Sequence, residues 1–95
     1  MTNRPSNAKL NLESIPKWKH SDEKLSRSFR FNSFLDAIDF FQQVAAYCEK
    51  VDHHPNWENC YRDVSVRLWT HDKNTVTQKD IELAKVMDEV AKKLL

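Results

Sequence analysis

The 95-residue chain contains no glycine. Glycine is the residue that most easily adopts left-handed backbone geometry, so every tight turn must here be built from other residue types. Asparagine, aspartate and proline each favour turns. Two polar segments contain aspartate or asparagine, namely residues 20–23 (HSDE) and residues 71–74 (HDKN). We therefore expect the chain to reverse direction in these two segments.

Cysteine is scarce as well, since Cys48 and Cys60 are the only two and their spacing is not that of a metal site. No signal peptide is visible, so we expect reduced thiols and a cytoplasmic location, or a nuclear one in addition. The apolar runs are only a few residues long, which excludes a membrane span.

An excess of charge of one sign is also missing, because 15 Lys and Arg stand against 14 Asp and Glu. Without a basic block, direct binding to nucleic acid is not expected. A content of 40% hydrophobic and 31% charged residues is typical of a globular protein. We expect a flexible tail at residues 1–8 and one domain over residues 9–95, whose small core favours self-association.

Two segments have the apolar periodicity of amphipathic helices. The first is predicted at residues 33–50, where Ser33 and Asp36 have capping-box spacing, with a buried stripe of Phe34, Ile38, Phe41, Ala45 and Cys48. The second begins at Thr77, where Asp80 repeats the capping pattern, and its predicted stripe is Ile81, Ala84, Met87, Val90 and Leu94.

Alternation of apolar and polar residues predicts strands before and between these helices. Residues 63–71 place one set of side chains toward the core, Val64, Val66 and Leu68, and the other set on the opposite face, Ser65, Arg67, Trp69 and His71. Residues 24–31 place Leu25, Phe29 and Phe31 on one face, with Arg27 as an exception, and a strand near residues 17–20 can pair with them. The order predicts an α+β domain, an antiparallel sheet with helices on one face.

Two adjacent histidines, His53 and His54, lie in the segment EKVDHHPNW between the first helix and the next strand. Pro55 pushes His54 toward extended geometry, so the two rings reach one pocket only if the chain bends there. A third histidine, His71, lies at the far end of the following strand. Nearby carboxylates that could support these rings are Glu49, Asp52 and Asp72.

Three interpretations of these histidines are open on spacing alone. They can be surface residues of polar loops, ligands of a metal ion, or a proton-transfer group. Adjacent histidines are not a typical ligand spacing, which disfavours the metal site. Imidazoles titrate near neutral pH without any burial, which suits general acid–base catalysis.

The combined motifs decide among these interpretations. The segment EKVDHHPNWENCY, the valine-rich strand, then THD and TQKDIELA resemble the pterin-4a-carbinolamine dehydratases. That family includes the dimerisation cofactor of a homeodomain transcription factor, and the resemblance extends from IPKW to the final helix. A lone His-His-Pro would not be specific, whereas the whole combination is.

The resemblance implies a four-stranded antiparallel sheet with three helices on one side, the third of them in residues 8–14. It also implies dimers joined through sheet edges and tetramers joined through helices. The family usually has glycine in the turn after Thr-His-Asp, where this chain has Asn74 and Thr75. Asparagine tolerates left-handed geometry, so we expect the turn to survive.

The activity implied is dehydration of 4a-hydroxytetrahydropterin to quinonoid dihydropterin in tetrahydrobiopterin recycling. The catalytic group would be His53, His54 and His71, with no metal and no cofactor, because the pterin is the substrate. Substrate-binding residues would come from the same segments and from one upstream tryptophan, namely Asp52, Pro55, Trp69, Thr70, Asp72 and Trp18. Glu49 and Asp80 would support the site, although helix capping also accounts for Asp80.

A second function is implied by the coactivator members of the family. In that alternative the chain is an interaction module, and its helical face binds a helical partner protein. The complete histidine set favours the enzyme, since a scaffold would not need it. The two activities can share one chain, with self-association as a dimer or tetramer in either case.

Overall fold

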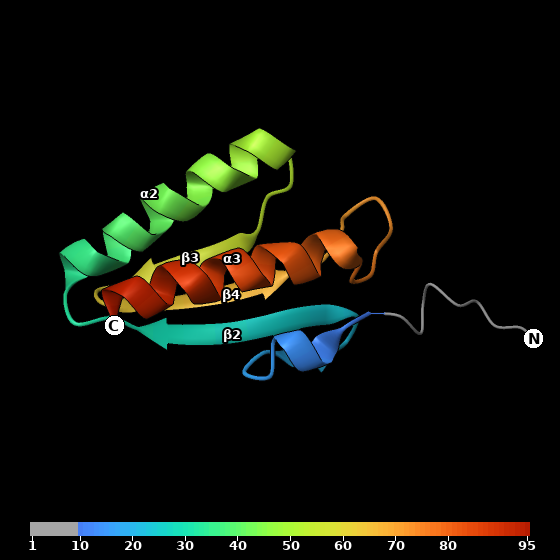
Figure 1. Ribbon diagram of the computed structural model, residues 1–95, viewed down its shortest axis with the longest axis horizontal. Coiled ribbons are helices and arrows are strands. Elements are labelled where there is room, and N and C mark those ends of the chain that lie inside the picture. Colours follow the sequence, from blue (N-terminus) through green and yellow to red (C-terminus); the bar gives the residue numbers. More distant parts are fainter. Residues whose placement is uncertain (1–9) are drawn as a thin grey trace, which may run out of the picture.

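The computed structural model describes residues 10–95, so the predicted tail at residues 1–8 lies outside the described part (Figure 1). Within residues 10–95, neither α-helix combines the length and apolar character that a membrane span requires. In chain order the elements are a short 3-10 helix η1 (Leu12–Ser14), β1 (Lys19–Ser21), β2 (Lys24–Arg30), α2 (Phe34–Val51), β3 (Asn56–Cys60), β4 (Asp63–Leu68) and α3 (Gln78–Leu94).

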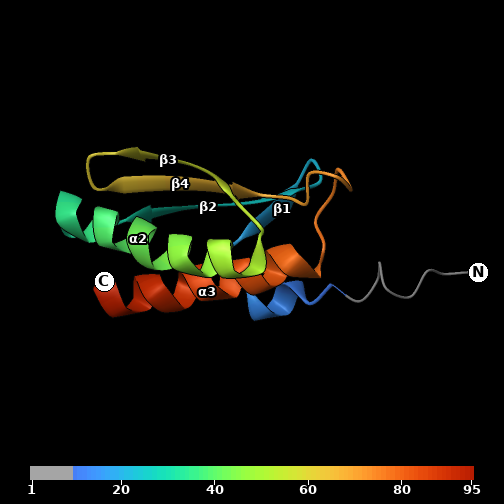
Figure 2. The same cartoon turned by 90° about the horizontal axis from the view of Figure 1, so that it is seen from above.

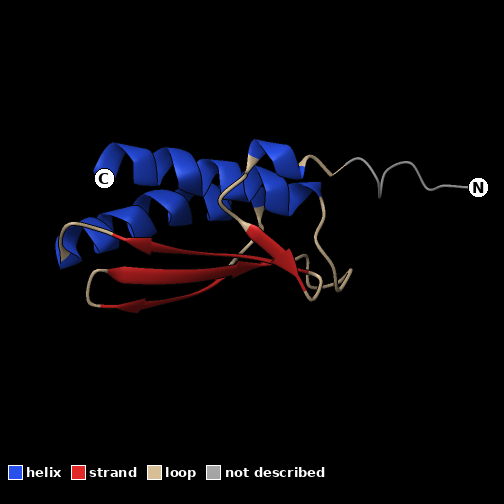
Figure 3. Ribbon diagram, turned by 90° about the horizontal axis from the view of Figure 1, so that it is seen from below, coloured by secondary structure: helices blue, strands red, loops and turns tan. Residues whose placement is uncertain are grey.

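The four strands form one antiparallel sheet in the order β1-β2-β4-β3. Both α-helices lie on the same face of this sheet (Figure 2, Figure 3). The predicted α+β architecture is therefore confirmed. The third helix expected in residues 8–14 is represented in the described part by η1 alone, whose Leu12 packs against the core; residues 8 and 9 lie outside that part.

The core lies between the sheet and the two helices, and the predicted strand faces are confirmed. Val64, Val66 and Leu68 of β4 are at most 1% exposed, as the alternation predicted. A cluster of aromatic rings joins β2 to α2, because the Phe29 and Phe31 centroids each lie 5.0 Å from that of Phe40. Each such side chain stabilises the fold by about 1.5–3 kcal/mol through burial.

The predicted buried stripe of α2 is wrong by about one residue. The fully buried side chains are Ala37, Phe40, Val44 and Cys48. Of the predicted stripe, Cys48 is therefore buried, and Phe41 is partly buried and packs against the core. Phe34 is 45% exposed, and Ala45 is exposed too. Apolar residues cover more of the surface of this helix than the sheet can bury. Periodicity alone therefore does not show which of them face the sheet. In α3 the predicted stripe is buried, except that Leu94 is half-buried.

Both helices begin at the predicted caps. Ser33 Oγ accepts a hydrogen bond from the Asp36 backbone N–H at 3.1 Å. Thr77 and Asp80 form a full capping box, in which each side chain binds the other residue's backbone N–H. These contacts satisfy backbone donors that the first helical turn leaves free, and each is worth about 1 kcal/mol.

Within residues 10–95, five residues adopt positive φ: Asp22, Glu23, Asp52, Tyr61 and Asn74. Asp22 and Glu23 have φ of 55° and 61° and form the two-residue connection between β1 and β2, as a type I′ turn requires. Asn74 has φ 55° in the turn that the Thr70–Thr75 bridge closes. Both predicted turns are therefore present, and Asn74 adopts the left-handed conformation that glycine would otherwise supply.

Candidate functional site

The histidine corner begins where α2 ends. Asp52 follows the helix with φ 54° and ψ 48°, a left-handed conformation that glycine usually supplies at this position. The backbone N–H groups of Asp52 and His53 both donate to the Cys48 carbonyl, the second at 3.2 Å. This cap turns the chain sharply, so the two histidines leave the helix in different environments: His53 is 8% exposed and His54 is exposed.

His53 is held by a buried carboxylate from the other helix. Its Nε2 lies 2.6 Å from Oδ1 of Asp80, which is fully buried in the first turn of α3. The second oxygen, Oδ2, accepts from the Thr70 hydroxyl at 2.8 Å and from the Thr77 backbone N–H at 2.9 Å. Asp80 therefore caps α3 with one oxygen and binds His53 with the other. Helix capping alone does not explain why an aspartate stands at this position.

This network fixes which ring nitrogen of His53 faces the carboxylate. An ionised carboxylate only accepts hydrogen bonds, so Nε2 donates to Asp80 and carries a proton. The proton-exchanging atom of a neutral ring is then Nδ1. The Thr77 hydroxyl, 2.5 Å from that of Thr70, extends the same network, since Thr70 already donates to Asp80.

His54 is held at the solvent side. Its Nε2 lies 3.0 Å from Oε2 of Glu49, and the side chains are 52% and 80% exposed. An exposed pair of this kind contributes little to stability. It does restrict the ring, because Glu49 projects from the last turns of α2 and His54 follows that helix.

His71 reaches the site from the end of β4. Its ring centroid lies 4.5 Å from that of Trp69, and the two planes are tilted by 39°. Trp69 is half-buried and His71 is exposed. The Thr70–Thr75 bridge holds the turn that carries His71, with Thr70 N–H donating to the Thr75 carbonyl at 2.9 Å.

These segments enclose a pocket of about 380 Å³. Its lining comes from the helix end, the strand end and the start of α3, and consists of Asp52, His53, His54, Trp69, Thr70, His71, Asp72 and Lys79. The structure thus brings all three predicted histidines to one pocket, together with four of the predicted binding residues. Glu49 and Asp80 do not line the pocket themselves. Glu49 contacts His54, and Asp80 contacts His53.

Lys79 was missed by the sequence analysis. It is the second residue of α3 and precedes Asp80, so the capping pattern that drew attention to Asp80 could also have indicated it. Its ammonium adds a positive charge to a pocket wall that carries the carboxylates Asp52 and Asp72.

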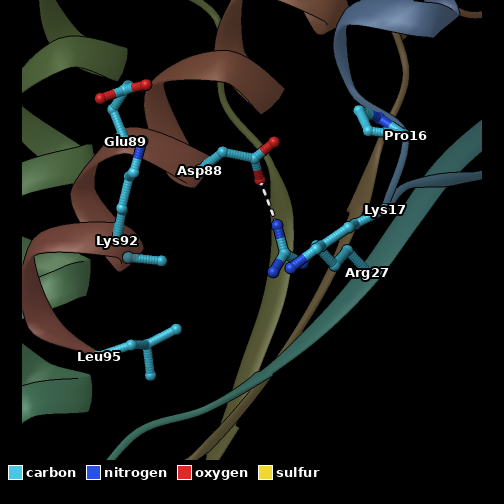
Figure 4. A pocket seen from close by; sticks show the side chains of 8 residues that line it. Pro16, Lys17, Arg27, Asp88, Glu89, Lys92 and Leu95 are labelled. Atoms are coloured by element: carbon cyan, nitrogen blue, oxygen red, sulfur yellow. Dashed lines mark hydrogen bonds and ion pairs between the residues drawn. The ribbon is translucent and has the colours of Figure 1, made fainter.

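Trp18 does not line the histidine pocket. It is 7% exposed, its ring packs edge-on against Phe29, and its Nε1–H donates to Asp88 Oδ1 at 2.8 Å. Asp88 also pairs with Arg27 at 2.6 Å and lines a separate hollow of about 370 Å³ (Figure 4). Pro55 likewise does not line the histidine pocket, although it follows His54 directly.

The thiol of Cys48 lies near the end of α2, just before the histidine corner. Burial raises the pKa of the Cys48 thiol to about 11, so at neutral pH it is protonated and a poor nucleophile. Among residues 10–95, no three His, Cys, Asp or Glu side chains are grouped so that they could hold a metal ion. The arrangement suits proton transfer by imidazoles to and from a small molecule.

Comparison with known proteins identifies the family of the chain. The family model described as Pterin 4 alpha carbinolamine dehydratase matches residues 2–90. A relative from Brucella ovis is 42% identical over 93 residues, which cover 94% of this chain and 96% of the relative. One from Prochlorococcus marinus is 39% identical over 79 residues, 83% of each chain. Both relatives are named as pterin-4-alpha-carbinolamine dehydratases only provisionally.

Two solved structures share the fold. A transcriptional coactivator/pterin dehydratase from Brucella melitensis is 44% identical, with a TM-score of 0.81 over 84% of this chain and 87% of that chain. A pterin dehydratase-like protein, described as a RuBisCO assembly factor in the alpha-carboxysome, is 21% identical, with a TM-score of 0.65 over 78% and 86%. The second likeness concerns the fold alone. From the family model and the close relatives together, this chain belongs to the pterin-4-alpha-carbinolamine dehydratase family.

Proposed function

We propose that the protein dehydrates 4a-hydroxytetrahydropterins to quinonoid dihydropterins, with imidazoles as the acid and base. The observation that carries this proposal is that His53, His54 and His71 line one pocket, with His53 held by a buried carboxylate. The family membership supplies the class of substrate.

The reaction is an elimination that needs two proton transfers. The bond from C4a to the hydroxyl oxygen breaks, and that oxygen leaves as water after it receives a proton from a general acid. A ring nitrogen loses a proton to a general base, and its electron pair forms the new double bond. Nothing is oxidised overall, so imidazoles that exchange protons near neutral pH are sufficient, and each transfer contributes about 10²–10⁴ in rate.

The pocket residues divide these tasks according to their positions. His53 presents Nδ1, since Asp80 occupies Nε2, while His54 and His71 lie on the more exposed side. Each of the three rings can give or accept a proton, so we assign proton exchange to the three together. Trp69 offers a flat surface on which a pterin can stack. Asp52 and Asp72 can accept hydrogen bonds from pterin N–H groups.

A direct assay tests this proposal. 4a-Hydroxytetrahydropterin is generated freshly and its disappearance is followed with and without the protein, because the compound also loses water spontaneously. We expect the protein to accelerate the loss, and the acceleration to survive exhaustive chelation of metal ions. A rate equal to the spontaneous one would refute the enzymatic function, and a requirement for added zinc would refute the proton-transfer mechanism.

A second candidate function is suggested by the outer face of α2. Leu35 is 74% exposed and Phe34 45%, and both lie in the first turn of α2, so this end of the helix presents apolar side chains to solvent. Such a face can bind a second copy of the chain or a helical partner, as in an interaction module. A chain that binds a helical partner through this face but lacks turnover would favour the module over the enzyme.

A further inference from the structure

The sheet face that carries no helix has a polar hollow beside the histidine pocket. The hollow measures about 290 Å³ and is lined by Lys19, Ser21, Asp22, Lys24, Ser26 and Arg67. Three of these six side chains are cationic and one is a carboxylate. The hollow therefore presents a net positive charge, and none of the proposed proton transfers uses it.

Strand register explains how the hollow forms. Lys19 of β1 lies opposite Ser26 of β2, and Ser26 lies opposite Arg67 of β4, so the three residues form one row across the sheet. Cross-strand neighbours share a face of the sheet. The small serine in the middle leaves a gap between two long cationic side chains.

The hollow and the histidine pocket meet at Trp69. The Lys24 ammonium, which belongs to the hollow, lies 5.0 Å from the centre of the Trp69 ring. The same tryptophan lines the histidine pocket and packs against His71. A ligand that stacks on Trp69 therefore has a polar, positively charged recess next to it.

The cations of the hollow have no carboxylate partner within residues 10–95. The ion pairs of this part of the chain involve other side chains, and Lys24 donates only to the Asp22 carbonyl, at 3.4 Å. Arg30 is on the same sheet face but is bound by Asp63 through both carboxylate oxygens, at 2.8 and 3.2 Å. Lys19 and Arg67 are free to bind an anion, whereas Arg30 is already occupied.

We propose that this hollow binds an anionic group on the side chain of the pterin, a phosphate ester or a carboxylate. This inference rests on the proposed function, since it assumes that the pterin ring occupies the histidine pocket. It deepens that function by naming the substrate class: pterins whose side chain ends in a negative charge. Arg67 would bind the anion with its planar guanidinium, and Lys19 would add a second positive charge.

Binding of stable pterins tests the inference without any turnover. Three fully oxidised pterins are compared, with side chains that end in a hydroxyl, a phosphate or a carboxylate, by quenching of their own fluorescence. We expect at least one anionic pterin to bind about tenfold more tightly than the neutral one. The better of the two anions identifies the source of the charge, and the preference should weaken as salt is added.

Two variants locate the anion. The double variant Lys19→Gln/Arg67→Gln should lose the preference while it binds the neutral pterin as before. Arg30→Gln, which removes a paired cation from the same face, should keep it. Equal binding of all three pterins to the unmodified protein, or an unchanged preference in the double variant, would overturn the inference. Failure of the proposed function would show separately, as absence of turnover with every carbinolamine.

Discussion

His53 and Asp80 are 27 positions apart in the chain, and they meet at 2.6 Å beneath the histidine pocket. One carboxylate thus joins the end of α2 to the start of α3. Removal of its charge by Asp80→Asn should lower the dehydration rate by about 10²-fold, because the amide has only one accepting oxygen for His53 and for the Thr77 cap, and that oxygen is uncharged. The free energy of unfolding should fall by about 1–3 kcal/mol. Turnover and urea unfolding measure the two effects.

The matched control for this variant is Asp36→Asn. Asp36 occupies the corresponding position in the first turn of α2, three residues after the cap Ser33, but touches no histidine. Its replacement should leave turnover unchanged. If Asp80→Asn and Asp36→Asn had the same turnover, Asp80 would be a helix cap and nothing more.

The exposed histidine of the pair can be tested with little risk to the fold. We expect His54→Ala to lower the dehydration rate by on the order of 10²-fold or more, with unchanged thermal unfolding, because the side chain is half exposed and outside the core. His20→Ala is the control, since His20 is an exposed histidine of β1 that does not line the pocket. Full activity in a folded His54→Ala protein would exclude this residue from catalysis.

The two cysteines should differ in reactivity. The pKa of Cys48 is raised to about 11 by burial, so at neutral pH an alkylating reagent should label the exposed Cys60 alone. Mass spectrometry should find one label per native chain and none on Cys60→Ser until urea is added. Native labelling of Cys48 would contradict its buried state.

The same shift makes a prediction about stability at alkaline pH. Folding favours the protonated thiol, so its contribution is fully present below the ordinary pKa of 9.0 and is lost as the pH rises through about 11. Unfolding by urea at pH 8 and at pH 10.5 should therefore differ more for the unmodified protein than for Cys48→Ala. An equal pH dependence of the two proteins would argue against a raised thiol pKa.

Backbone strain in the connection between β3 and β4 should be removable. Tyr61 has φ 57° and a side chain that is largely in solvent, and a residue with Cβ pays about 1 kcal/mol or more in this conformation. Tyr61→Gly should raise the free energy of unfolding by up to about 1 kcal/mol relative to Tyr61→Ala. The alanine variant removes the same ring but keeps Cβ, so equal stability of the two would show that the backbone is unstrained.

Self-association through α2 gives the last prediction. We propose a tetramer built from dimers, in which the outer apolar face of α2 forms the interface between dimers. Leu35→Glu, which places a charge on the most exposed apolar side chain of that face, should yield dimers in sedimentation experiments at micromolar concentration. Gln78→Glu, an exposed position on α3, should leave the assembly intact. A compact monomer before any substitution would contradict the proposal.

The sheet and both helices could be predicted from the sequence because their signals are local. Alternation placed Val64, Val66 and Leu68 on the core face, and capping spacing placed the start of α3 at Thr77. The stripe of α2 was placed wrongly because Phe40 and Phe41 are adjacent and both apolar. The choice between them depends on how the helix meets Phe29 and Phe31 of the sheet side, a tertiary contact without a local signal.

The sequence indicated which residues form the site, but not how all of them are arranged in space. Motif resemblance indicated the three histidines, which the structure brings to one pocket. Nothing local showed that Asp80 would divide its oxygens between Thr77 and His53, since that requires α2 and α3 to lie side by side. Trp18 was expected near the pterin, but in the structure its indole binds Asp88.

The divided carboxylate of Asp80 has a consequence for the dynamics of the site. The first turn of a helix is where fraying begins, and fraying of α3 would withdraw the oxygen that holds His53. The fraction of molecules in which His53 is held by Asp80 is then set by local opening of the α3 N-terminus, not by global unfolding. Amide hydrogen exchange at Asp80, whose N–H is held by the Thr77 cap, therefore reports on how often the pocket is assembled.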